Sequence, residues 1–146
     1  MRNLEADYRR IAEIKAAYEA AREAENENGM DAARADMKAL NAVIGTESKE
    51  YGRILRFLEE SREKENERLD IADNIWDREV EGLVQTMREA GIKEFTFSST
   101  WTSATETAWL FTSLGCNLKG MVEINGSKDF MSETYEKKHA FLFTID

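Results

Sequence analysis

The stretch Gly91-Ile92-Lys93-Glu94-Phe95-Thr96-Phe97-Ser98 decides the fold, because the pattern of the sequence changes within it. Before Gly91, apolar residues recur every three or four positions, as on one face of a helix. From Lys93 to Ser98, polar and apolar residues alternate, which is typical of a strand that buries one face. Gly91 itself suits the left-handed position that follows many helices. The sequence therefore predicts an α+β protein whose helical part ends near residue 91.

Upstream of this stretch, the sequence predicts one long antiparallel helical hairpin over residues 1–91. The apolar spacing indicates helices over about 3–44 and 47–90, and the absence of proline removes the strongest helix stop. If the chain reverses near Gly45, the apolar positions of the two helices lie opposite each other, as in a coiled coil. A break at Gly29, which would give three shorter helices, is the alternative.

Downstream, residues 92–146 predict a small βαββ subdomain with a three-stranded mixed sheet. After the strand at 93–98, a helix should begin near Ser103, because Ser103 and Glu106 are spaced as in a capping box. Strands over 118–124 and 139–145 complete the sheet, and the last is aromatic and β-branched enough to be central and antiparallel. So small a sheet buries little apolar surface alone. We therefore expect it to pack on the second long helix.

The composition of the 146-residue chain excludes several classes of protein. One Cys and one His cannot form an internal disulfide or a His/Cys metal cluster, so we expect no metal and no cofactor. A net charge of −9 argues against direct binding to nucleic acid, which depends on Lys and Arg. Neither a signal peptide nor a membrane span is recognisable, so the cytoplasm is the expected location.

Residues that could carry catalysis are scattered along the sequence. Cys116 has His139 as the only imidazole available to activate it, and His139 lies on a different predicted element. The hydroxyl-rich loop 98–103 joins a strand to a helix N-terminus, where anions are favoured, but it contains no Gly, Lys or Arg. We therefore expect a protein that is not an enzyme, and a ligand at loop 98–103 is the weaker hypothesis.

The one patterned surface in the sequence is acidic. Seven carboxylates recur every three or four residues on the predicted second helix, and no basic residue interrupts them. On a continuous helix they would form a row about 33 Å long. Such a row is either a solvated face or a surface for a basic partner, to which Trp101 could add an apolar anchor. The candidate partner-binding residues are Glu59, Glu63, Glu67, Asp70, Asp73, Asp77, Glu81 and Trp101.

The C-terminal segment resembles a family of small uncharacterised proteins encoded by phages and mobile elements of Firmicutes. The resemblance covers about residues 90–146 and rests on Phe95–Ser99, Glu106–Trp109, Gly120–Asn125, Lys128–Phe130 and Ala140–Phe143. It brings no catalytic motif with it. What it implies is a context in which small acidic proteins often inhibit host defence, anti-CRISPR proteins among them.

The residues and the resemblance together predict a non-enzymatic binding protein. In this hypothesis, the acidic helix face occupies a basic, nucleic-acid-binding groove on another protein, such as a CRISPR effector nuclease, in the bacterial host cytosol. The chain itself is expected to bind neither nucleic acid nor membrane. The alternative is a structural module in which the hairpin pairs with a second copy to form a homodimeric helical bundle.

Overall fold

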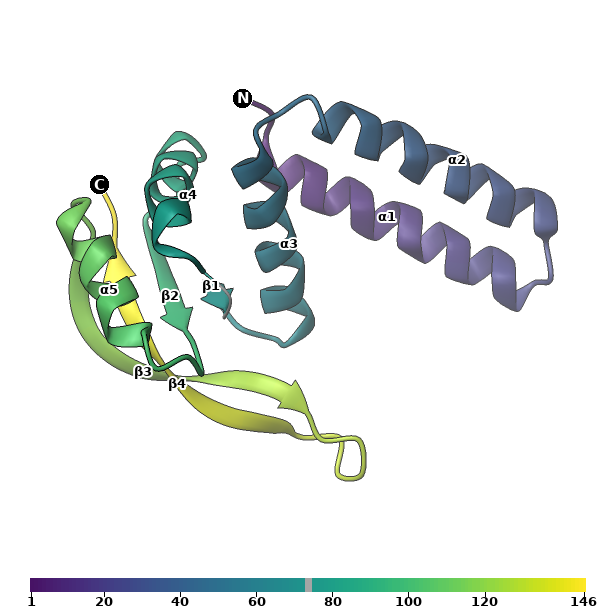
Figure 1. Ribbon diagram of the computed structural model, residues 1–146. Helices are drawn as coiled ribbons and strands as arrows, with labels where there is room; N and C mark the ends of the chain where they lie inside the picture. The colour runs from purple at the N-terminus through teal and green to yellow at the C-terminus, as the bar shows by residue number, and fades with distance from the viewer. Residues whose placement is uncertain (73–74) are drawn as a thin grey trace. The chain divides into compact units, whose positions relative to one another are not determined.

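The computed structural model describes residues 1–72 and 75–146, and the chain divides into two compact units, residues 1–55 and 56–146. The described residues form five helices and four strands (Figure 1). The predicted α+β class is confirmed. No helix in the described part of the chain has the length and apolarity needed to cross a membrane.

The first unit contains a helical hairpin made of α1 (Leu4–Glu23) and α2 (Glu27–Ile44), followed by the first half of α3 (Lys49–Glu63). The chain reverses just before α2. Glu25 takes a φ of 53°, and the side chain of Asn26 caps α2 by accepting a hydrogen bond from the Gly29 amide at 3.0 Å. An unbroken helix over 3–44 is therefore wrong, and the break lies a few residues before Gly29. As a consequence α1 pairs with α2, and not with a helix over 47–90.

A buried polar group joins α1 to α3 within this unit. Asp7 is 3% exposed, and its carboxylate accepts hydrogen bonds from the Arg2 guanidinium at 2.7 and 3.0 Å and from the Tyr51 hydroxyl at 2.6 Å. The hydrogen bond from Arg2 lowers the pKa of Asp7, and burial raises the pKa of Tyr51. The Asp7 carboxylate therefore has hydrogen-bond partners within the apolar core that Ile11 and Ile54 help to form.

The predicted single helix over 47–90 is also wrong. The helix α3 ends at Glu63, residues Leu69–Ala72 form strand β1, and α4 begins at Asp77 and ends at Glu89. The first break has a local cause. Glu65 takes a φ of 60°, and the Asn66 amide donates to the Ser61 carbonyl at 2.9 Å, which is the six-to-one bond of a Schellman motif.

The four residues of β1 pair with another strand instead of continuing a helix. The strand β1 runs parallel to β2 (Glu94–Ser98), with Leu69 opposite Phe95 and Ile71 opposite Phe97. Leu69 and Ile71 are both buried. The helical spacing of this segment is thus overridden by a partner that lies some 25 residues further along the chain.

The sheet has four strands in the order β1-β2-β4-β3, so the predicted three-stranded sheet is corrected by the addition of β1. The succession β2, α5 (Ala104–Ser113), β3 (Asn117–Lys128) and β4 (Tyr135–Thr144) confirms the predicted βαββ order. The last strand is central and antiparallel to both of its neighbours, as expected. The helix α5 begins where it was predicted, but the Ser103 side chain makes no capping hydrogen bond.

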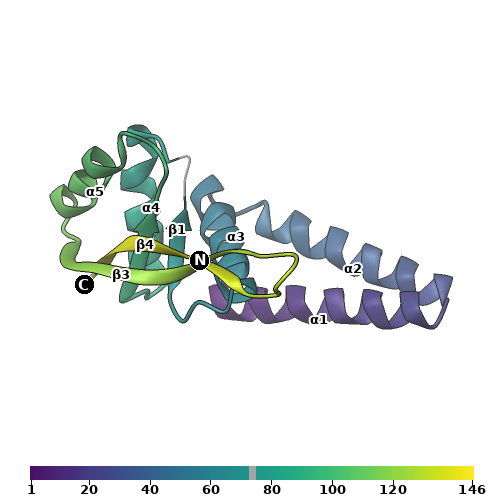
Figure 2. The ribbon, with the colours of Figure 1, turned by 90° about the horizontal axis from the view of Figure 1, so that it is seen from below.

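One face of the sheet is covered by α4 and α5, which lie on the same side of β3 and β4 (Figure 2). Phe111 of α5 is fully buried and packs on three sheet residues, with ring centroids 5.2 Å from Phe95 and 5.4 Å from both Phe97 and Phe143. This packing holds α5 against the sheet, and α4 contacts α5. The two helices begin at the edge where β1 and β2 end.

Candidate binding site

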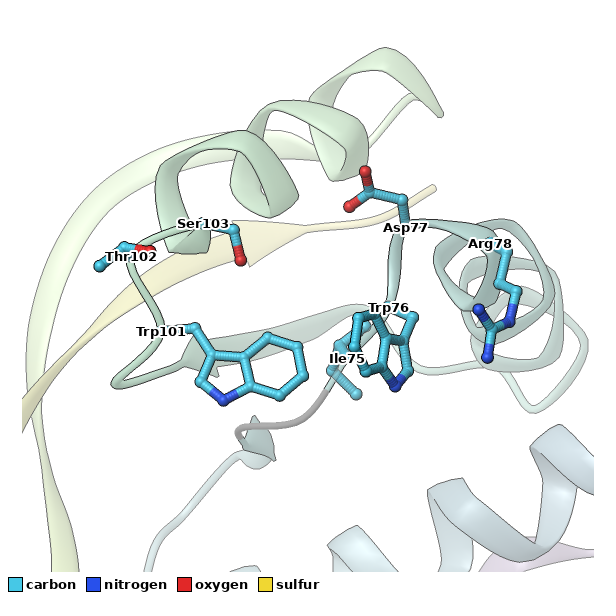
Figure 3. Close-up of a pocket in the computed structure, with 7 residues that line it drawn as sticks. All are labelled: Ile75, Trp76, Asp77, Arg78, Trp101, Thr102 and Ser103. Atoms are coloured by element: carbon cyan, nitrogen blue, oxygen red, sulfur yellow. The ribbon is translucent and has the colours of Figure 1, made fainter.

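A pocket lies at the carboxyl ends of the two parallel strands. In sheets of this kind, the loops that follow parallel strands meet at one edge, and ligands commonly bind there. The loop after β1 leads into α4, and the loop after β2 leads into α5. The described residues of these two connections line a pocket of about 610 Å³ that is open to solvent. Figure 3 shows its lining side chains. The lining residues are Ile75, Trp76, Asp77, Arg78, Trp101, Thr102 and Ser103.

Two tryptophans form the apolar part of this pocket. The ring centroids of Trp76 and Trp101 are 5.1 Å apart, and the ring planes meet at 64°, close to an edge-to-face arrangement. Trp76 is 54% exposed, and Trp101 is partly exposed. The guanidinium carbon of Arg78 lies 5.6 Å from the centroid of Trp76, so that Trp76 stands between Trp101 and Arg78 (Figure 3).

The backbone on either side of each indole is held by the start of a helix. Trp76 is the N-cap of α4, and its amide donates to the Glu79 carboxylate at 3.2 Å while its carbonyl accepts from the Glu79 amide at 2.9 Å. The Trp101 amide donates to the Ser99 hydroxyl at 3.1 Å, and the Trp101 carbonyl accepts from the Ala104 amide at 3.1 Å. The pocket is therefore largely preformed.

The charges around the pocket favour a cation over an anion. Asp77 and Glu79 lie in the first turn of α4, and Glu106 lies in the first turn of α5. These carboxylates offset the positive ends of the two helix dipoles, which would otherwise attract a phosphate. Among the described lining residues, Arg78 alone is basic. The chain as a whole carries a net charge of −9.

The chemistry of the pocket is recognition by stacking, cation–π contact and hydrogen bonding. Cys116 does not line it and is buried, and burial raises the pKa of its thiol, which disfavours the nucleophilic thiolate. His139 lies on β4, far along the chain from the lining residues. Within residues 1–72 and 75–146, no three His, Cys, Asp or Glu side chains gather closely enough to hold a metal ion.

The predicted acidic row does not exist as one helix face. Its members lie on separate elements: Glu59 and Glu63 on α3, Glu67 in the turn that follows, Asp70 on β1, and Asp77 and Glu81 on α4. Asp73 lies outside the described residues. The row required a helix over 47–90, and β1 interrupts that helix.

Asp70 shows the consequence most clearly, because the residue is only 5% exposed. It accepts hydrogen bonds from Thr96 Oγ1 and Ser98 Oγ, each at 2.7 Å, and its amide donates to the Ser61 hydroxyl at 2.9 Å. Burial raises the pKa of Asp70, and the two hydroxyl hydrogen bonds oppose this effect. Asp70 therefore joins β1 to β2 within the core and offers no surface to a partner.

Two of the predicted site residues do line the pocket, namely Trp101 and Asp77. Thr102 and Ser103 of the hydroxyl-rich loop join them. Trp76 was not predicted as a site residue, because it fits the apolar spacing of the predicted helix over 47–90. A signal existed in the residues that follow: Asp77 and Glu79 are typical of a first helical turn, which puts Trp76 at the N-cap.

Comparison with known proteins identifies a family. Residues 53–145 match the model of the domain of unknown function DUF7698, and because the match spans more than half of the chain, the chain belongs to this family. The matched segment begins close to the second unit, which starts at residue 56, so the whole pocket lies within the family domain. The helices α1 and α2 precede it. No curated protein and no solved structure matches the chain.

Proposed function

We propose that this member of the DUF7698 family is a non-enzymatic binding protein, and that its pocket docks a basic segment of another protein. The observation that carries the proposal is the pair of partly exposed indoles, Trp76 and Trp101, at the ends of two parallel strands. Tryptophan is enriched among the few residues that supply most of the binding energy at interfaces. Covering an exposed indole removes its apolar surface from water, and a preformed pocket loses little conformational entropy on binding, so both effects favour a complex.

The charge of the partner follows from the charges around the pocket. An anionic ligand would approach Asp77, Glu79 and Glu106 in a chain of charge −9, whereas a basic segment would be attracted to them. The described residues of the lining also include no glycine, whereas a glycine-rich backbone commonly surrounds a phosphate. These features support a cationic peptide over a nucleotide.

The proposal keeps two parts of the sequence hypothesis, the basic partner and Trp101 as the apolar anchor. It replaces the row of seven carboxylates with a compact pocket. A nucleic-acid-binding effector, inhibited in the manner of an anti-CRISPR protein, remains our proposal for the class of partner, because such proteins expose segments rich in Lys and Arg.

Fluorescence anisotropy with two labelled peptides of equal length tests the proposed function. One contains repeated Gly-Arg-Leu units, and the other contains Glu in place of Arg. We expect the basic peptide to bind, with an affinity that falls as salt is added. Trp101→Ala should weaken binding by about 30-fold or more, as expected for a residue that dominates an interface.

Trp109→Ala is the matched control. Trp109 is 67% exposed on α5 and does not line the pocket, so its replacement should change the affinity less than about twofold. Circular dichroism of both variants verifies that they are folded. Preference for the acidic peptide, absence of binding by either peptide, or equal affinity of wild type and Trp101→Ala would overturn the proposal.

A further inference from the structure

We infer that the pocket recognises a guanidinium group, so that the basic segment binds through an arginine, and that Arg78 occupies the Trp76 ring until this arginine displaces it. The inference rests on the proposed function and specifies its ligand. It starts from a contact already present in the structure, in which the guanidinium carbon of Arg78 lies 5.6 Å from the centroid of the Trp76 ring.

This contact shows that the exposed indole accepts a guanidinium. A planar, weakly hydrated guanidinium stacks on an aromatic face, whereas the ammonium of lysine is compact and strongly hydrated. Trp76 is bordered by Trp101 on one side and by Arg78 on the other (Figure 3). Arg78 therefore occupies the side of the Trp76 ring away from Trp101. An incoming arginine would compete with Arg78 for this side.

The rest of the lining supplies acceptors suited to the same group. In Figure 3, Asp77 lies above Trp76 at the α4 end of the pocket and Ser103 lies above Trp101 at the other end, so Asp77 is the acceptor nearer to the Arg78 side. A guanidinium has five N–H donors in a fixed plane, so it can stack on an indole and still donate to a carboxylate or a hydroxyl at its edge. The ammonium of lysine has no planar face with which to stack on the indole while it donates. The pocket should therefore prefer arginine.

Arg78 differs from the other lining residues in the expected effect of its removal. If it occupies the ring in the unbound protein, an incoming arginine must displace it. Arg78 is exposed on the first turn of α4, so the contact it makes is weak and readily exchanged. Replacing Arg78 should tighten binding, whereas replacing a residue that contacts the ligand would weaken it.

The first experiment compares three peptides by isothermal titration calorimetry, identical except at the position that holds arginine, lysine or citrulline. Citrulline keeps the shape of arginine without its charge. The arginine peptide should bind about tenfold or more tightly than the other two. Equal affinities of the arginine and lysine peptides would overturn the guanidinium assignment and leave the proposed function standing, whereas no binding by any of the three would overturn both.

The second experiment uses Arg78→Gln and Arg78→Lys with the arginine peptide. Both variants should bind it about two- to fivefold more tightly than wild type, because neither side chain stacks on Trp76 as well as arginine does. Arg78→Lys keeps the positive charge, so tighter binding by this variant separates competition for the ring from a change in charge. Unchanged or weaker binding by Arg78→Lys would overturn the role of Arg78 as an internal competitor.

Discussion

Replacing Asp70 with alanine tests whether this carboxylate belongs to the core. The substitution removes the acceptor of two hydrogen bonds, from Thr96 Oγ1 and Ser98 Oγ, each at 2.7 Å. Both hydroxyl groups belong to buried residues and would be left without this partner. An unsatisfied buried polar group costs about 1–3 kcal/mol, so Asp70→Ala should lower the free energy of unfolding by about 2–6 kcal/mol. That is a large part of the roughly 5–15 kcal/mol that stabilises a typical domain.

The pH dependence gives the same residue a second test. Because burial raises the pKa of Asp70, the protonated form is favoured in the folded state. The group therefore contributes stability below its unfolded pKa of about 3.9, and this contribution is lost as the pH rises through the raised pKa of the folded state. Asp70→Asn resembles the protonated carboxyl group and does not titrate. Across this window, wild type should lose stability relative to Asp70→Asn as the pH rises.

Urea unfolding followed by tryptophan fluorescence suits these variants, because Trp76, Trp101 and Trp109 all lie in the unit formed by residues 56–146. Glu81→Ala is the matched control, since Glu81 belonged to the same predicted acidic row but is exposed on α4. The free energy of unfolding of Glu81→Ala should stay within about 0.5 kcal/mol of that of wild type. If Asp70→Ala and Glu81→Ala unfold at the same urea concentration, the buried role of Asp70 is refuted.

Three further predictions test the packing of both units. In residues 1–55, Tyr51→Phe removes the 2.6 Å hydrogen bond to Asp7 and should lower the free energy of unfolding by about 1.5–3 kcal/mol, measured by far-ultraviolet circular dichroism in urea. Phe111→Ala removes a fully buried ring and should lower the free energy of unfolding by about 3–5 kcal/mol. A calorimetric melting temperature close to that of wild type would contradict the aromatic core. Phe130→Ser with Met131→Ser, at positions 93% and 87% exposed, should leave the melting temperature unchanged, whereas a large decrease would mean that these side chains are packed.

Local pattern was sufficient to predict the order of the elements after Gly91 but not the length of the last hairpin, because β3 runs to Lys128 and β4 begins at Tyr135. The alternation over 93–98 and the aromatic run at 139–145 are strand signals contained in the residues of each segment itself. The short strand β1 could not be found in this way. A helix would also fit the spacing of Leu69, Ala72 and Trp76. The segment forms a strand because it pairs with the edge of β2, which is distant in sequence.

The helical hairpin failed for a related reason. Periodicity predicted helical faces correctly within α1 and α2 but carried no information about which helix they face. Two turns, one near Gly45 and one near residues 24–26, both place apolar residues opposite each other. The pairing of α1 with α2 depends on the turn between them, which is set by the positive φ of Glu25 and the side-chain cap from Asn26. Helical periodicity does not report such features.

The candidate site was half predictable. Trp101 was a candidate because it is a tryptophan in the loop between a predicted strand and a predicted helix, and tryptophan is enriched at interfaces. Its partner, Trp76, could not be assigned without β1, because the two indoles meet only when β1 and β2 are parallel neighbours whose following loops lie at one edge. The acidic row failed with the helix that was expected to carry it.

The most direct test of the pocket as the binding site is a proton–nitrogen correlation spectrum of the three indole Nε1–H groups during titration with the arginine peptide. The signals of Trp76 and Trp101 should shift together as peptide is added. The signal of Trp109, exposed on α5 and outside the pocket, should stay in place. Shifts of equal size at all three indoles, or a shift at Trp109 alone, would contradict the assignment of this pocket as the binding site.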